Sequence, residues 1–216
     1  MRHAFSFHPD VRDAVRRHVY EAWSALSTDG YARESAWVAA CAGRLHGRAY
    51  EGPHGLVDFQ STIVDAPGRA SAESRFGADL AITASISEGG IAIRSAILLQ
   101  AKLGRLSHLA PAEAARLIDQ IRKMQQLTRA PKILEIPTEN GDGRPYVLSG
   151  ILMAEGRPTQ ALRLEDYFTR RVLPTLDGDT RDGFVDAVQE SSLTRVHVRA
   201  IRTVPRSGRD QRSLFE

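Results

Sequence analysis

Residues 73–102 read ESRFGADLAITASISEGGIAIRSAILLQAK, and this stretch decides the fold that we expect. Its second half is rich in Ile and Leu and poor in turn residues, as a largely buried strand should be. Gly89 and Gly90, which follow Glu88, supply the positive φ angles of a tight hairpin turn. The pattern therefore predicts that residues 79–87 pair antiparallel with residues 91–102.

This hairpin would bring three polar side chains to one end of a sheet. Side chains alternate between the faces of a strand, so Gln100 and Lys102 share a side and lie roughly 6–7 Å apart at their Cα atoms. Asp79, on the other strand, returns opposite them. A carboxylate, an amide oxygen and an ammonium at one sheet edge favour a divalent metal ion and an activated water. The structural alternative is that Lys102 extends from a strand end and Gln100 satisfies a loop backbone.

Gly77-Ala78-Asp79 followed by Gln100-Ala101-Lys102 resembles the PD-(D/E)xK nuclease superfamily, in its variant with Gln in place of the second acid. The similarity extends over about residues 34–150, with the motif confined to residues 73–102. It implies the restriction-endonuclease-like fold, an α/β (α+β sandwich) protein in which helices flank a central mixed sheet of four to six strands.

The resemblance also implies roles for individual residues. Asp79 and Gln100 would bind Mg²⁺, for which Mn²⁺ can substitute, and Lys102 would position or activate the attacking water. A further acid completes such sites, and Glu34 and Glu73 compete for this place. Glu34 is also expected in the first turn of a helix, where a carboxylate favours the helix dipole in any case. The helix after Lys102 often carries a Gln that faces the site in this variant, and Gln120 and Gln125 are the candidates.

The composition supports a special role for Lys102. The chain contains 26 Arg but only three Lys, at positions 102, 123 and 132. Lys is a compact point charge whose pKa moves on burial, whereas Arg stays protonated and forked. A chain that otherwise uses Arg has Lys at the end of its most apolar strand.

Size and composition limit the class of protein. A length of 216 residues with 42% hydrophobic and 25% charged residues suits one globular domain. The single cysteine, Cys41, excludes an internal disulfide and any multi-Cys zinc site. No apolar run approaches the roughly 20 residues of a membrane helix, and the N-terminus lacks the apolar core of a signal peptide. We therefore expect a cytoplasmic protein without a membrane partner.

The remaining elements are expected in the following order. Helices are predicted over residues 9–26, 33–45, 111–127, 164–172 and 181–189, and further strands over residues 56–65, 132–136, 145–153 and 193–204. Residues 46–55, with three glycines and a proline, are predicted to be a loop. Residues 1–153 would form a nuclease core with N-terminal helices. Residues 154–216 would form a C-terminal extension with a basic tail, packed on the same domain.

Basic residues suggest where nucleic acid would bind. Residues 191–216 carry six Arg against two acids, a net charge of +4 on a chain whose total is +3. Arg195, Arg199 and Arg202 in this region, and Arg75 beside the motif, are the candidate phosphate contacts; a solvated tail is the alternative. DNA is expected before RNA.

The resulting functional hypothesis is a Mg²⁺-dependent endonuclease that hydrolyses phosphodiester bonds in DNA or RNA. The family resemblance suggests a homodimer, or a subunit of a larger complex in restriction or antiviral defence. The alternative hypothesis is a catalytically inactive nucleic-acid-binding or assembly subunit on the same fold.

Overall fold

A computed structural model describes residues 5–27, 30–31, 33–64, 75–136, 138 and 143–203. The helical segments are α1 (Pro9–Ser24), α2 (Glu34–Leu45), η2 (Leu106–His108), α4 (Pro111–Leu127), α5 (Gly150–Ala154), α6 (Leu164–Tyr167), η3 (Phe168–Val172) and α7 (Asp182–Gln189). The strands are β1 (Gly47–Gly52), β2 (Gly55–Thr62), β3 (Leu80–Glu88), β4 (Ile91–Leu103), β5 (Lys132–Ile136), β6 (Tyr146–Ser149), β7 (Leu162–Arg163) and β8 (Thr194–Arg202).

The eight strands of the described residues belong to one mixed sheet in the order β1-β2-β8-β3-β4-β5-β6-β7. The α/β class with a central mixed sheet is confirmed, but the sheet is larger than the four to six strands predicted. The additional strands are β1 and β7, at the two edges of the sheet. β1 falls in the segment predicted to be a loop, because its sequence GRAYEG begins and ends with glycine. It is nevertheless a strand, since β2 offers it an antiparallel hydrogen-bonding edge.

The predicted central hairpin is present. β3 and β4 pair antiparallel from Leu80 with Leu99 to Glu88 with Ile91. Gly89 and Gly90 have φ angles of 55° and 86°, the left-handed pair that a two-residue turn between twisted strands requires. α4 then carries the chain across to β5, which lies parallel to β4.

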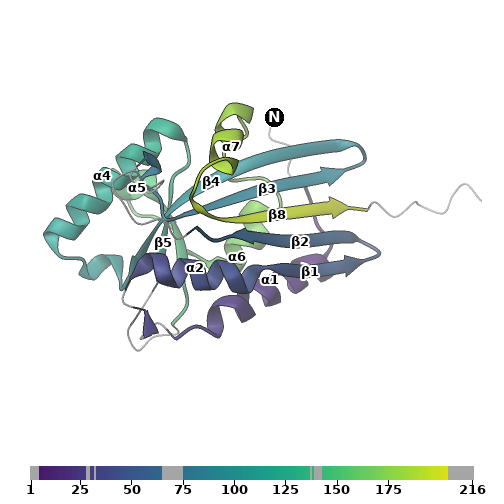
Figure 1. The fold of residues 1–216 in the computed structure, drawn as a ribbon, viewed down its shortest axis with the longest axis horizontal. Coiled ribbons are helices and arrows are strands. Elements are labelled where there is room, and N and C mark those ends of the chain that lie inside the picture. The colour runs from purple at the N-terminus through teal and green to yellow at the C-terminus, as the bar shows by residue number, and fades with distance from the viewer. Residues whose placement is uncertain are drawn as a thin grey trace, which may run out of the picture.

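β8 has an unexpected position in the sheet. It lies between β2 and β3, antiparallel to the former and parallel to the latter (Figure 1). Val196 and Val198 of β8 are part of the main hydrophobic core. The segment beyond residue 153 therefore contributes a strand to the interior of the same sheet.

In the described part of the chain, two hydrophobic clusters, one on each face of the sheet, pack the helices against it. Alternation along β4 divides them, since Leu99 belongs to the cluster under α1, α2 and α6, whereas Leu98 belongs to the cluster under α4 and α7. The second cluster is completed by Leu117 and Ile121 of α4 and Val185 of α7, all fully buried. The result is a three-layer arrangement of helices, sheet and helices.

The strand predicted over residues 145–153 is half correct. β6 ends at Ser149, and its hydroxyl oxygen then accepts a hydrogen bond from the backbone N–H of Leu152 at 3.4 Å, which caps α5. The N–H of Gly150 donates to the carbonyl of Pro131 at 3.0 Å.

No helix in the described ranges combines the length and the apolar character that crossing a bilayer would need.

Candidate active site

The segment before β3 is held in place by a close approach to α4. Gly77 has a φ of 68°, and a Cβ atom at this position would lie 2.7 Å from the carbonyl oxygen of Gln120 and 3.1 Å from Cβ of Lys123. Glycine is therefore required for two reasons, the left-handed backbone and the contact with the helix. This contact fixes the chain two residues before Asp79.

Asp79 faces the end of β4, as its place in the hairpin predicts. Its backbone N–H donates at 3.0 Å to the carbonyl of Leu99, the residue that also pairs with Leu80, so Asp79 lies just beyond the last pair of the ladder. Its carboxylate oxygen Oδ2 accepts from the N–H of Ala101 at 2.8 Å and from the side-chain NH₂ of Gln100. Two donors from β4 thus orient this carboxylate.

Lys102 brings a second carboxylate to the same end of β4. Its Nζ lies 3.5 Å from Oε1 of Glu34, the first residue of α2. The Lys102 side chain is 14% exposed and that of Glu34 is 34% exposed, so the pair lies where a substrate could reach it. Glu34 is 45 residues from Asp79 in the sequence, and the packing of α2 under the sheet brings it to β4.

Gln100 has an oxygen atom available for a ligand. Its side chain is 1% exposed, and Oε1 has no hydrogen-bond partner among the described residues. A buried amide oxygen without a protein partner is costly, so its presence in a polar site favours a cation or water as its ligand. A half-turn of the amide would bring Oε1 toward Asp79, and two facing oxygens are favourable when a cation lies between them. The residues present therefore fit a Mg²⁺ ion.

Gln120 is the better of the two glutamine candidates on α4. It is 9% exposed, and its Oε1 also has no partner in the described part of the chain, whereas Gln125 is exposed. Its backbone carbonyl lies close to Gly77, so this turn of α4 packs against the segment that leads to Asp79. Of the two acids that compete to complete the site, Glu34 is the one that the structure describes, and Glu73 lies outside the described residues.

The four predicted phosphate-binding arginines differ in their surroundings. Arg195 donates to the carbonyls of Val188 and Gln189 at the end of α7, and burial lowers its pKa. Arg202 is paired with Glu88 across the strand ends. These two guanidinium groups therefore have internal structural partners, which argues against their predicted role in binding nucleic acid.

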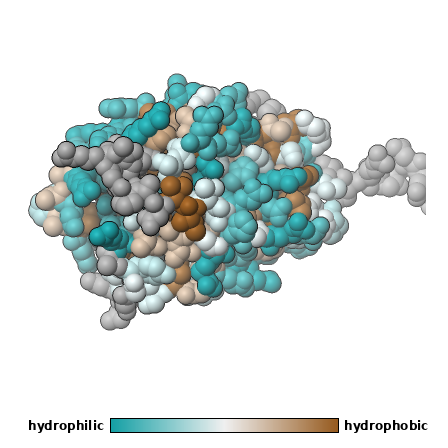
Figure 2. All heavy atoms as spheres, viewed as in Figure 1, coloured by the Kyte–Doolittle hydropathy of each residue, from teal (hydrophilic) through white to brown (hydrophobic). Residues whose placement is uncertain are grey.

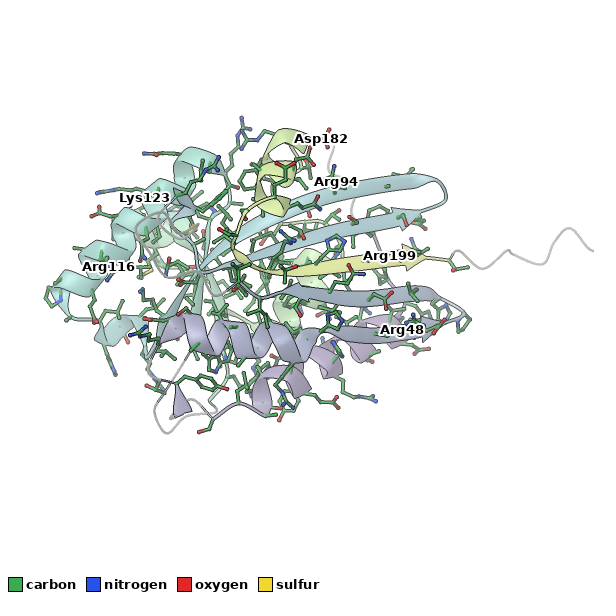
Figure 3. All side chains as sticks on the ribbon, in the orientation of Figure 1. Arg48, Arg94, Arg116, Lys123, Asp182 and Arg199 are labelled. Carbon is green, nitrogen blue, oxygen red and sulfur yellow. The ribbon has the colours of Figure 1, made fainter. Side chains whose placement is uncertain are left out.

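Arg199 and Arg75 are both exposed. The Arg75 guanidinium lies over the Phe76 ring at 5.3 Å from its centroid. Arg199 projects from β8, with Arg94 and Arg48 on other strands of the sheet (Figure 3). Hydrophilic side chains cover much of the surface over these strands (Figure 2). Arg94 is held by Asp186 at 2.6 Å and Arg48 by Asp58 at 3.1 Å, so Arg199 is the candidate of this group best placed to meet a phosphate.

One polar contact at the centre of the sheet was not predicted from the sequence. Nδ1 of His197 lies 2.9 Å from Oγ1 of Thr83 on the neighbouring strand. Burial lowers the pKa of His197, and the nearby charges of Arg195, Arg199 and Arg94 lower it further. Alternation along β8 could have placed His197 beside two arginines, but its contact with Thr83 depends on the position of β8 in the sheet.

Comparison with protein-family models, with curated proteins and with solved structures gave no match to this chain.

Proposed function

We propose that this chain is a Mg²⁺-dependent nuclease of the PD-(D/E)xK type on a restriction-endonuclease-like core. One observation carries the proposal. Gln100 and Lys102 are two residues apart at the end of β4. Gln100 contacts Asp79, and Lys102 forms an ion pair with Glu34. Further support comes from the surrounding topology, an antiparallel hairpin followed by a helical crossover to a parallel strand.

The described side chains divide into a ligand set and a positioning group. Asp79, Gln100 and Glu34 would hold the ion with their oxygen atoms, a small set that suits Mg²⁺, which keeps several of its waters. When bound, Mg²⁺ supplies Lewis-acid polarisation of a phosphodiester and a lower pKa for a bound water. Lys102 would orient the attacking water and offset negative charge that develops on the phosphate. DNA is the first substrate to test, and RNA the second.

The test is cleavage of labelled DNA and RNA with Mg²⁺ or Mn²⁺ by the wild-type chain and by Lys102→Ala. Loss of one positioned catalytic group typically costs roughly 10²-fold or more in rate. Lys132→Ala is the matched control, because Lys132 is also 14% exposed and also paired with a carboxylate, Asp177 at 2.8 Å. Lys102→Ala should lose cleavage and Lys132→Ala should retain it. Equal rates for the wild type and Lys102→Ala would refute the assignment.

A second candidate function is a nucleic-acid-binding or assembly subunit with an inactive site. It is favoured by two contacts that pair the four side chains with one another. The NH₂ group of Gln100 contacts Asp79 and the ammonium of Lys102 contacts Glu34, an arrangement that needs no cation. Binding of labelled nucleic acid that is insensitive to EDTA and produces no cleavage would support this alternative. A homodimer, or a place in a larger restriction or antiviral complex, is part of both proposals.

A further inference from the structure

Two histidines and an aspartate that are distant in sequence meet at the far end of the sheet. In the described ranges, His8, Asp10 and His54 are a group of potential metal ligands whose donor atoms all lie within 4.8 Å of one another. Nδ1 of His8 is 3.4 Å from Oδ2 of Asp10, and Nε2 of His54 is 3.9 Å from the same oxygen. The two imidazole rings are stacked, with centroids 3.6 Å apart and planes inclined by 14°.

These distances are close to what a zinc ion requires. Zinc binds imidazole nitrogens and carboxylate oxygens at about 2.0–2.2 Å, so tetrahedral ligand atoms lie roughly 3.3–3.5 Å apart. The pair formed by His8 and Asp10 already has this separation. The His54 ring would need to approach the Asp10 oxygen by about half an ångström and to turn out of its stack with His8, because a metal ion lies in the plane of each imidazole that binds it. Two nitrogens and one oxygen suit a first-row transition metal and do not suit Mg²⁺, which prefers oxygen ligands. We propose that His8, Asp10 and His54 form a Zn²⁺ site at the surface, in which a water supplies the fourth ligand.

The backbone around the three residues is well anchored. His8 is the N-cap of α1, where its Nδ1 accepts a long 3.3 Å hydrogen bond from the N–H of Asp10. His54 lies in the β1–β2 turn, and its carbonyl accepts from the N–H of Thr203 at 3.3 Å. Zinc would replace the long cap bond of His8. The positive end of the α1 dipole opposes a cation only weakly at an exposed position, and the carboxylate of Asp10 offsets this.

The position of the site indicates its role. Gly55 pairs with Arg202, which in turn pairs with Glu88, so the β1–β2 turn and the β3–β4 turn lie at the same end of the sheet. Figure 1 shows both turns at the end opposite to β5. Asp79 and Lys102 lie at the β5 end, a full strand length away. A metal ion at the turn would therefore fasten the start of α1 to the β1–β2 hairpin without entering the candidate active site.

The experiment is calorimetric titration of the untagged, EDTA-treated full chain with Zn²⁺, together with thermal unfolding with and without Zn²⁺. The wild type should bind one ion per chain and unfold at a higher temperature when zinc is present. His54→Gln and Asp10→Ala should both lose this binding and the temperature shift. His108→Gln is the control, because His108 is exposed on η2 and outside the group; it should behave as the wild type.

Each outcome decides the proposal. Absence of wild-type binding below about 100 µM Zn²⁺, or binding that survives in either variant, would overturn it. If His54→Gln fails to fold, Asp10→Ala alone is decisive, because the Asp10 side chain is 66% exposed and its removal disturbs no packing. Loss of zinc binding in the His108→Gln control would also count against the assigned ligands.

Discussion

Gly77→Ala should destabilise the protein more than replacement of any exposed turn glycine. An alanine at the Gly77 φ of 68° costs about 1–2 kcal/mol in backbone strain. Its Cβ would also lie 2.7 Å from the Gln120 carbonyl, a backbone atom that can move only with α4, and overpacking of this kind costs about 1–3 kcal/mol. Reduced freedom of the unfolded chain returns about 0.4–1 kcal/mol. The expected net loss is roughly 2–4 kcal/mol, or a melting temperature lower by roughly 5–15 °C.

Two further glycines separate the causes of this loss. Gly89 has a φ of 55°, but a Cβ atom added there would meet no other atom within 4 Å, so Gly89→Ala tests backbone strain alone. Gly183, in α7, has neither a positive φ nor a near neighbour, so Gly183→Ala should be neutral or stabilising by up to about 1 kcal/mol. The assay is denaturant unfolding of the three variants and the wild type. A shift in the denaturant concentration at the midpoint, with an unchanged m-value, reports the change in the free energy of unfolding.

The comparison has a clear refuting result. If Gly77→Ala costs no more than Gly89→Ala, the close contact between α4 and the segment before β3 is not a constraint on the fold. The reasoning that this contact positions Asp79 would then fail as well. If instead Gly77→Ala is the most destabilised, Asp79 should also be displaced, and any metal-dependent cleavage should fall below that of Gly89→Ala under conditions where both are folded.

Two other predictions follow from pKa shifts. Burial raises the pKa of Cys41 to about 12, so its thiol should react with a disulfide reagent at pH 8 only after unfolding; rapid reaction of the native chain would contradict this. The folded-state pKa of His197 is depressed, chiefly by burial, so the unfolded chain binds its proton more readily. The stability that neutral His197 contributes is therefore present above about pH 6.5 and is lost as the pH falls through the lower, folded pKa. The stability difference between the wild type and His197→Gln should accordingly narrow between pH 7 and pH 5; a difference that does not change with pH would contradict this.

Local patterns were sufficient for the β3–β4 hairpin and for the polar end that it forms. The period of two in a strand and the demand of a tight turn for glycine are short-range effects. They made the register predictable, and the first pair of that register, Leu80 with Leu99, brings Asp79 next to Gln100 and Ala101. The helices α1, α2, α4 and α7 were predicted to within a few residues at each end for a similar reason, since their apolar faces repeat at helical spacing.

Local patterns could not predict which distant segments meet. Edge strand β1 has a glycine-containing sequence and is extended only because β2 offers it hydrogen bonds. The internal partners of Arg195 depend on α7 and β8 being neighbours. The group formed by His8, Asp10 and His54 exists because the N-cap of α1 lies against the β1–β2 turn.

By itself, then, the sequence determined the central hairpin and the carboxylate, amide and ammonium at its end, because adjacent strands joined by a two-residue turn allow few alternative registers. Only the tertiary structure decided that β8 lies between β2 and β3 and that Glu34 is the acid that meets Lys102. The physical reason is that such contacts depend on the burial of apolar faces from segments far apart in the chain, and residue spacing carries no information about which faces will be buried together.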